Sequence, residues 1–349
     1  ATGDYAIHKT RHHARSVCAR KRCMLILLCA IVLILISWNA VAIMHVRAMT
    51  RFVPEGQRTA SPEELNAVDK IKTLVFGARM PRPENSETPA DYGLEFESMT
   101  INSSAETTLG LWHVPNKNAK TIVLLCHGYG ASKASLLDEA AAFVELGMAC
   151  VLMDFPGSGE SSGNRTTIGY NEADDVRSVV DHLQATFPEK KLILFGQSMG
   201  AAAVLRSSSI HQNCVDAIII EAVFDTLLQT VINRFNSMGV PPFPSAQLLT
   251  FWGGVVMGVK PFAHNPVDYA AGVRQPTLVL HGSDDPRARL GEGKRVFSAL
   301  SGPKKLVVFD GVKHESFQGD NVKKWRTAVR DFVGEHVLTP ANIAPSGGR

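Results

Sequence analysis

A serine in the middle of the chain lies where it could act as a nucleophile. Residues 196–200 read Gly-Gln-Ser-Met-Gly, with an apolar run at 192–195 before them and a helix-forming run at 201–205 after them. A sharp turn from strand to helix needs glycines beside the serine, because a Cβ would clash with the strained backbone. The motif alone often arises by chance, and a plain glycine-rich turn is the alternative. The flanking elements therefore carry the prediction that Ser198 is a nucleophile.

A base and an acid that could activate this serine follow it in the sequence. A serine hydroxyl needs a base to take its proton, and the base needs a third group to hold its tautomer. Asp285 follows an apolar run at 277–280, and His314 follows the last such run, at 306–309. Serine, acid, histidine is the chain order expected for a serine on this kind of turn. Asp284 is the rival acid, but it can equally bind its own backbone in a turn, so we predict Asp285.

The same chemistry needs backbone N–H groups that hold an oxyanion. One donor is expected in the loop after the strand at 121–125, where residues 126–130 read Cys-His-Gly-Tyr-Gly. The other is the residue that follows the nucleophile. We therefore predict an oxyanion hole formed by Tyr129 and Met199, with a plain turn in this loop as the alternative.

Strands that alternate with helices must position these residues. The apolar runs are short, continuous and rich in β-branched residues, as in buried strands of a parallel sheet. They lie at 121–126, 149–153, 192–195, 215–220, 277–280 and 306–309. Helix-length segments lie at 132–146, 169–187, 199–210, 289–300 and 318–337. Two alternating stretches near 94–101 and 108–114 are expected to add an antiparallel edge. The pattern predicts an α/β fold, with a mostly parallel central sheet and helices on both faces.

One interval interrupts this alternation. About 50 residues, at 227–276, separate the sixth strand from the seventh. They are mostly apolar and carry few charges. A structureless loop of this length is unusual in a compact domain, so we predict a helical cap over one end of the sheet.

The N-terminal segment has a different composition from the rest of the chain. Of the net charge of +3, residues 1–23 carry +5, so the remaining residues carry −2. A slightly acidic folded part has no basic stripe for phosphates, which argues against nucleic-acid binding. An apolar segment then runs from Cys23 to Met44, long enough at about 1.5 Å per residue to cross a membrane core. We predict a transmembrane anchor at 23–46, with a cleaved signal peptide as the alternative because Ala40-Val41-Ala42 has the small-x-small form.

The charges around this segment predict its orientation. The basic tail at 1–22 is richer in Lys and Arg than the segment that follows the anchor, so we expect the tail in the cytoplasm and the large C-terminal part outside it. Residues 47–91 should form a helix that starts at Ser61, followed by a proline-rich connector. The catalytic domain is expected at 92–337 and a flexible tail at 338–349. The six cysteines have neither the spacing of a zinc site nor that of a disulfide framework.

With these features together, the chain resembles an α/β-hydrolase. It is similar to the serine hydrolases that include esterases, monoacylglycerol lipases and membrane-anchored acyl-thioesterase-like proteins. The resemblance covers about residues 92–337 and rests on the oxyanion turn at 127–128, the turn at 154–161, the serine motif, Asp285 and His314. It implies that the turn at 154–161 is structural, that the cap shapes the acyl or alcohol pocket, and that neither a metal nor an organic cofactor takes part.

We therefore predict a serine hydrolase that cleaves carboxylic esters or thioesters through an acyl-enzyme. The apolar cap and the nearby membrane favour a lipid-like acyl substrate. A serine peptidase of the same fold is one alternative, and it would need an acidic group near Ser198 to hold a substrate ammonium. A binding or scaffold protein with a silent hydrolase fold is the other, but such a protein has no need of all three catalytic groups.

Overall fold

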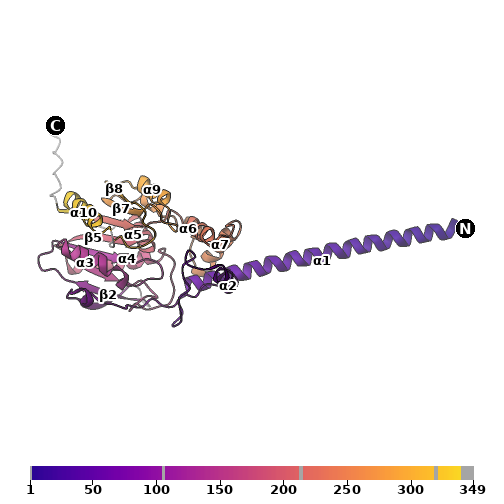
Figure 1. Cartoon of the computed structure of the whole chain (residues 1–349), viewed down its shortest axis with the longest axis horizontal. Helices are drawn as coiled ribbons and strands as arrows, with labels where there is room; N and C mark the ends of the chain where they lie inside the picture. Colours follow the sequence, from indigo (N-terminus) through magenta and orange to yellow (C-terminus); the bar gives the residue numbers. More distant parts are fainter. Residues whose placement is uncertain (1, 104–106, 212–214, 318–320, 339–349) are drawn as a thin grey trace, which may run out of the picture.

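The computed structural model describes residues 2–103, 107–211, 215–317 and 321–338, with side chains from residue 20 onward. Figure 1 shows an α/β domain from which one long helix, α1 (Thr2–Thr50), projects. The basic tail and the predicted anchor are thus parts of one continuous helix. Most of the tail predicted at 338–349 lies outside the described residues.

A single sheet forms the centre of the domain. Its strand order is β1-β2-β4-β3-β5-β6-β7-β8. The strands are β1 (Glu97–Asn102), β2 (Thr108–Val114), β3 (Thr121–Cys126), β4 (Ala149–Met153), β5 (Lys191–Gln197), β6 (Ala217–Glu221), β7 (Thr277–Gly282) and β8 (Lys304–Phe309). Strands β3 to β8 run parallel, whereas β1 and β2 form the antiparallel edge. The predicted fold class and its antiparallel edge are confirmed.

Helices cover both faces of the sheet, because each central strand is apolar on both sides. One face packs against α3 (Leu137–Glu145) and α10 (Val322–Val333), with Phe143, Phe195 and Trp325 in contact. The other face packs against α4 (Glu172–Thr186), α5 (Met199–His211) and α9 (Leu290–Ala299). The parallel strands therefore direct their carboxyl ends to one edge, between two helical layers.

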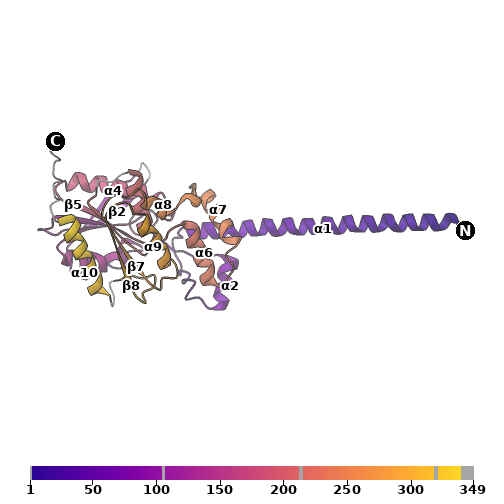
Figure 2. The same cartoon turned by 90° about the horizontal axis from the view of Figure 1, so that it is seen from above.

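The interval between β6 and β7 is helical, as predicted. It contains α6 (Leu227–Met238), α7 (Ser245–Met257) and α8 (Pro266–Ala270). Helix α8 packs against α5 and α9, so it belongs to a main helical layer. Helices α6 and α7 stand apart from the sheet, between the domain and the free part of α1 (Figures 1 and 2). The cap therefore consists of α6 and α7.

The helix expected from Ser61 begins later. Helix α2 spans Ala67–Phe76, and the side chain of Asn66 caps it by accepting the Asp69 N–H at 2.9 Å. Ser61 and Glu64 instead close a separate turn, in which the Ser61 N–H donates to a Glu64 carboxylate oxygen at 3.2 Å. The prediction of a helix start at Ser61 was wrong because Asn66 is also a good N-cap and takes that role.

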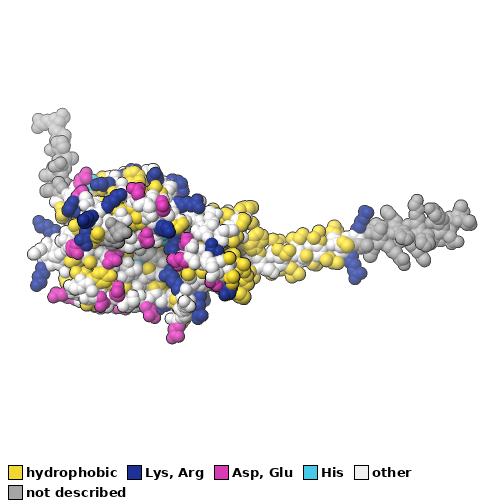
Figure 3. Space-filling view, in the orientation of Figure 1, with side chains coloured by type: hydrophobic (Ala, Val, Ile, Leu, Met, Phe, Trp, Pro, Cys, Tyr) yellow, Lys and Arg dark blue, Asp and Glu magenta, His cyan; other side chains and the backbone are white. Residues whose placement is uncertain are grey.

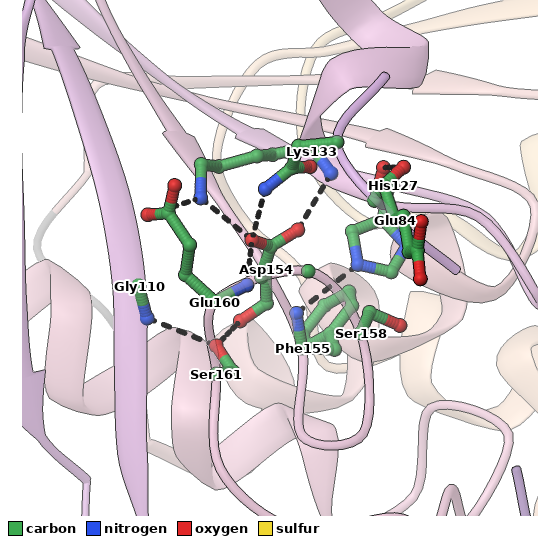
Figure 4. A network of polar contacts seen from close by, with 12 residues as sticks. Glu84, Gly110, His127, Lys133, Asp154, Phe155, Ser158, Glu160 and Ser161 are labelled. Carbon is green, nitrogen blue, oxygen red and sulfur yellow. Dashed lines mark hydrogen bonds and ion pairs between the residues drawn. The ribbon is translucent and has the colours of Figure 1, made fainter. Parts of the chain in front are cut away.

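A buried lysine holds in place the loops that follow β3 and β4 (Figure 4). Lys133 is inaccessible to solvent, and its Nζ lies 2.6 Å from Asp154 Oδ2 and 2.9 Å from Glu160 Oε2. The same ammonium lies 4.3 Å from the ring centroid of Trp112. Asp154 also accepts the N–H groups of Lys133 and Glu160. The network joins the loop after β3 to the turn after β4, so that turn is structural, as the family resemblance implied.

We expect Lys133→Met to lower the free energy of unfolding by about 3–5 kcal/mol, because it leaves the buried Asp154 carboxylate without its counter-ion. Chemical denaturation of the whole chain in detergent measures this loss. The matched control is Lys191→Met, since Lys191 pairs with Asp216 at 2.8 Å but is about half exposed. That variant should lose less than about 1 kcal/mol. Equal losses in the two variants would contradict a special role for the buried pair.

Candidate active site

Ser198 occupies a strained turn between β5 and α5. Its φ is +53°, a value that non-glycine residues seldom adopt. A Cβ on Gly200 would lie 2.1 Å from the carbonyl oxygen of Cys126, and a Cβ on Gly196 would lie 2.6 Å from that of Gly200. Both glycines are therefore required by the close approach of α5 to the strands. The Ser198 N–H donates to the carbonyl of Glu221 at 2.8 Å, which secures the turn to β6.

The structure brings His314 between Ser198 and Asp285. His314 Nε2 lies 3.1 Å from Ser198 Oγ, and His314 Nδ1 lies 2.7 Å from Asp285 Oδ2. The Asp285 carboxylate is buried, and its Oδ1 accepts the N–H groups of Arg287 and Ala288 at 2.8 and 2.9 Å. These bonds hold the carboxylate so that one oxygen always faces the imidazole.

Asp284, the rival acid, lies outside this arrangement. Its side chain is exposed and accepts a hydrogen bond from the hydroxyl of Ser283 at 2.7 Å. It therefore takes the turn role that the sequence allowed for it, while its neighbour Asp285 contacts His314.

The hydrogen bonds assign the protons of a neutral His314. Because Asp285 accepts only, Nδ1 carries the proton and donates it to the carboxylate. Nε2 is then unprotonated and can accept the hydroxyl proton of Ser198. The arrangement can thus remove a proton from a serine and return it to a leaving group.

Tyr129 and Met199 flank Ser198 with backbone N–H groups that no described residue accepts. Met199 is the first residue of α5, so its N–H has no partner within the helix. On the other side, a Cβ on Gly128 would lie 3.7 Å from the Cβ of Ser198, which brings the loop before Tyr129 against the serine. Both N–H groups therefore come from segments that adjoin the serine.

His127 fixes the shape of this loop. Its Nε2 accepts the Phe155 N–H at 3.1 Å, so Nδ1 carries the proton and donates to the Gly128 carbonyl at 2.8 Å. Burial lowers the pKa of His127, which keeps the ring neutral and preserves both bonds. The side chain of Tyr129 points elsewhere, and its hydroxyl donates to the carbonyl of Met49 at 2.6 Å. The end of α1 is thus tied directly to the loop beside the serine.

Sequence analysis missed three arginines: Arg58 and Arg234 contact this loop, and Arg287 lies near Arg234. Arg58 donates to the Gly130 carbonyl at 2.8 Å, and Arg234 of α6 lies 5.6 Å from the Tyr129 ring centroid. Arg287 comes two residues after Asp285 and pairs with Glu63 at 3.5 Å. These residues are remote from one another in the sequence and form no motif, so only the fold could have revealed them.

The cap is tied to the loop that carries Asp285. Asn233 of α6 is buried, and its amide donates to the Arg287 carbonyl at 2.9 Å and to Glu292 at 2.6 Å. Near the start of the cap, Asp225 pairs with Arg295 at 2.7 Å. These contacts set the position of Arg234 relative to Asp285.

Two buried carboxyl groups lie behind the serine. Glu221 accepts a hydrogen bond from the indole of Trp325, and Glu139 accepts one from Ser316. Burial, followed by the charge of the nearby Glu139, raises the pKa of Glu221 to about 8. Burial likewise raises the pKa of Glu139 to about 7. Both groups thus favour the protonated, neutral form in the folded protein.

Known proteins resemble this chain in sequence and in fold. A family model described as serine aminopeptidase, S33 (Hydrolase_4), matches residues 117–238. In structure, the chain is similar to an esterase from Pyrococcus furiosus, with a TM-score of 0.62 and 20% identity over 73% of this chain and 97% of that one. The chain has the α/β-hydrolase fold. It shares with the solved esterase the fold alone, because the identity is low.

Two relatives are similar to this chain in sequence. The Bacillus subtilis protein YqkD is 24% identical over 243 residues, which cover 69% of this chain and 80% of that one. A Saccharomyces cerevisiae protein described as a membrane protein is 26% identical over 148 residues, or 42% of this chain and 51% of its own. In this chain, helix α1 is long and apolar enough, between Arg20 and Thr50, to cross a membrane.

The raised pKa of Glu221 predicts a dependence of stability on pH. Between the unfolded pKa near 4.5 and the folded value of about 8, the folded state binds more protons than the unfolded state. Stability therefore falls as pH rises through that window. In Glu221→Gln this contribution is absent, so its melting temperature should rise relative to that of the parent between about pH 5 and pH 8.

The control for this measurement is Glu189→Gln, which changes an exposed carboxylate. Its melting temperature should follow that of the parent at every pH. A difference between Glu221→Gln and the parent that stays constant with pH would contradict the assignment of a neutral, buried Glu221.

Proposed function

We propose that this protein is a membrane-anchored serine hydrolase that cleaves carboxylic esters or thioesters. The observation that carries the proposal is the position of His314, which lies within hydrogen-bond distance of both Ser198 Oγ and Asp285 Oδ2. A base that is oriented by a buried acid and aimed at a strained serine has no evident structural use.

In the proposed reaction, Ser198 Oγ attacks the carbonyl carbon while His314 Nε2 takes the hydroxyl proton. The carbonyl oxygen becomes an oxyanion and accepts the N–H groups of Tyr129 and Met199. His314 then gives its proton to the leaving alcohol or thiol as the bond to the carbonyl carbon breaks. Water, activated by the same imidazole, cleaves the acyl-enzyme and restores the serine. Asp285 stays ionised and stabilises the imidazolium in both halves.

A peptidase is the second candidate, because the description of the matching family model names a serine aminopeptidase. Such an enzyme must hold the substrate ammonium with an acidic group near the serine. Arg58 and Arg234 contact Gly130 and the ring of Tyr129, and Glu63 is already paired with Arg287. The carboxylates of Glu84, Glu87 and Asp138 line a hollow beside the following residues of the loop. The two cations beside Tyr129 repel an ammonium, so we favour an ester or thioester substrate.

We propose that α1 is retained as a single membrane anchor. Arg20, Lys21 and Arg22 precede its apolar segment, so the tail lies in the cytoplasm and the catalytic domain on the other side. Cleavage after Ala42 would remove Asn39, whose side chain accepts the indole N–H of Trp252 in α7 at 2.9 Å. This contact between the apolar segment and the cap supports an anchor over a cleaved signal peptide.

Ser198→Ala should lower kcat on p-nitrophenyl esters by about 10⁴-fold or more, because no other group can form the acyl-enzyme. Asp285→Asn should cost about 10⁴-fold by leaving His314 without its orienting carboxylate. The assay uses the whole chain in detergent, since the end of α1 is packed into the domain. A series of esters of increasing acyl length reports which chain length the site accepts.

Asp284→Asn is the matched control, and its kcat should stay within about threefold of the parent because Asp284 is exposed. Equal losses at the two aspartates would contradict the proposed triad. Absence of both ester turnover and fluorophosphonate labelling of Ser198 would favour the scaffold alternative. Labelling together with cleavage of aminoacyl amides in place of esters would favour the peptidase.

A further inference from the structure

Arg234 is a charged side chain without a charged partner. It extends from α6 toward the ring of Tyr129, and it makes no ion pair or hydrogen bond through its guanidinium with any residue that the structure describes. Burial and the nearby Arg287 and Arg58 lower the pKa of Arg234, whereas Tyr129 and Glu63 raise it. The side chain is partly exposed, and a guanidinium that is partly withdrawn from water gains stability when an anion pairs with it.

The neighbouring charges do not supply that anion. Arg58 is bound to the carbonyl of Gly130, and Arg287 shares the single carboxylate of Glu63. The charges that act on Arg234 are thus two guanidinium groups, of Arg58 and Arg287, and one carboxylate, of Glu63. The local charge is positive and can accept a negatively charged group from outside.

The position of these arginines relates them to the active site. Arg58 contacts the loop that carries the Tyr129 N–H, whereas Arg287 donates its own backbone N–H to Asp285. Asn233, one residue before Arg234, binds the Arg287 carbonyl. The cluster thus borders both the oxyanion loop and the loop of the acid.

We propose that Arg234, with Arg58 and Arg287, binds an anionic group on the substrate, a carboxylate or a phosphate. The inference deepens the proposed hydrolase function and rests on it for the identity of the substrate as an ester. A guanidinium presents a planar fork of donors that matches the oxygens of a carboxylate or phosphate. The substrate is then an acyl ester with a negative charge close to the scissile bond.

Two matched pairs of esters test this proposal and distinguish the sources of the anion. One pair is mono-p-nitrophenyl glutarate and its methyl ester, which differ in a charge on the acyl side. The other is 1-decanoylglycerol 3-phosphate and 1-decanoylglycerol, which differ in a charge on the alcohol side. In at least one pair, kcat/KM should be about 10-fold or more higher for the anionic member.

Arg234→Gln should remove that preference, so the ratio of kcat/KM within the pair should fall to near 1. Lys260→Gln is the control, because it removes an exposed cation from the same interval between β6 and β7 and should leave the ratio unchanged. Preference for the neutral member in both pairs, or an unchanged ratio in Arg234→Gln, would overturn the proposal.

A binding measurement separates this inference from the hydrolase proposal. Glutarate or glycerol 3-phosphate should raise the melting temperature of the parent, whereas glycerol should not, and Arg234→Gln should lose the shift. A shift without ester turnover would retain the anion site and remove the hydrolase function. Ester turnover without a rise in melting temperature and without a preference for the anionic ester would retain the hydrolase function and remove the anion site.

A separate observation concerns how the cap meets α1. Helix α7 has no charged residue, and it packs against α1 through the bond between Trp252 and Asn39. Phe251 and Val255 lie on its outer side, where they are 52% and 57% exposed. Figure 3 shows hydrophobic side chains gathered where the domain joins the apolar part of α1.

The position of Asn39 gives the depth of this contact. If the hydrocarbon core begins at Cys23 and is about 30 Å thick, it ends about 20 residues later, near Ala42. Asn39 then lies about 4–5 Å inside that boundary, and Trp252 lies at the same level. A helix bound at this depth must itself contact lipid.

Helix α2 adds a second apolar surface beside the same stretch of α1. Its Leu74 carbonyl lies 2.9 Å from His45 Nε2, and Gly77 adjoins Ala48. The exposed large apolar side chains of α2 are Val68, Ile71, Val75 and Phe76, and Lys72 is exposed beside them. They lie just beyond the end of the hydrocarbon core, where a bilayer presents its headgroups and upper acyl chains.

The geometry points to a collar, formed by α7 and α2, that is immersed in the bilayer that α1 crosses. Its occupant is lipid, because the exposed apolar side chains are continuous with a helix of membrane length. The inference rests on the proposed anchor, from which the depth of the collar follows.

Quenching of tryptophan fluorescence by lipids brominated on the upper acyl chain tests this inference in the whole chain, in phosphatidylcholine vesicles. Trp112 and Trp325 are buried in the domain, so Trp38→Phe leaves Trp252 as the reporter of the collar, and Trp252→Phe leaves Trp38 as the reporter of α1. The double variant supplies the background. We expect both reporters to lose fluorescence.

Quenching of Trp38 without quenching of Trp252 would overturn the collar and retain the anchor. Quenching of Trp252 by aqueous acrylamide, without quenching by brominated lipid, would also overturn the collar and retain the anchor. Absence of lipid quenching from both reporters would overturn the anchor together with the collar that depends on it.

Discussion

The close approach of helix α5 to the end of strand β3 is the constraint on which the candidate site depends. No side chain fits between Gly200 and the Cys126 carbonyl, so the chain must pass from β5 into α5 within a single strained residue. That residue is Ser198. The same turn leaves the Met199 N–H free at the start of the helix and brings the loop of Tyr129 against the serine. The loops after β7 and β8 then need only carry Asp285 and His314 to the same edge of the sheet.

The surroundings of this turn contain several charged or titratable groups that water does not reach. Lys133 and Asp154 neutralise each other behind the oxyanion loop, whereas Glu139 and Glu221 avoid the cost of burial by favouring the protonated form. A paired buried charge such as Lys133 with Asp154 gives rigidity at the cost of a desolvation penalty. Arg234 differs from them because no residue in the described part of the chain pairs with its charge, and for that reason it is the group from which a ligand can be inferred.

Helix α1 is more than a tether in this fold. Its last turns pack against the cap. The carbonyl of Met49 accepts a hydrogen bond from the hydroxyl of Tyr129, a residue of the loop beside the serine. The N-terminal helix, the cap and the oxyanion loop therefore form one packed unit. A hydrolase organised in this way would receive an amphiphilic ester at the surface of the membrane, with its apolar chain near the collar and its charged part near the arginines.

The sequence by itself determined the α/β class, the order of the strands along the chain, the helical interval between β6 and β7, and the candidate Ser198, Asp285 and His314. These features are local, since hydrophobic period, β-branched runs and glycine-flanked turns act over a few residues. The predicted start of α2 at Ser61 was wrong, because Ser61 and Asn66 are both good N-cap residues and Asn66 caps the helix. Only the tertiary structure decided that Asp285 and not Asp284 contacts His314, that Lys133 is buried, that α7 packs on α1, and that Arg58, Arg234 and Arg287 meet. Each of these depends on the approach of residues remote in the chain, for which a single sequence has no periodic signal.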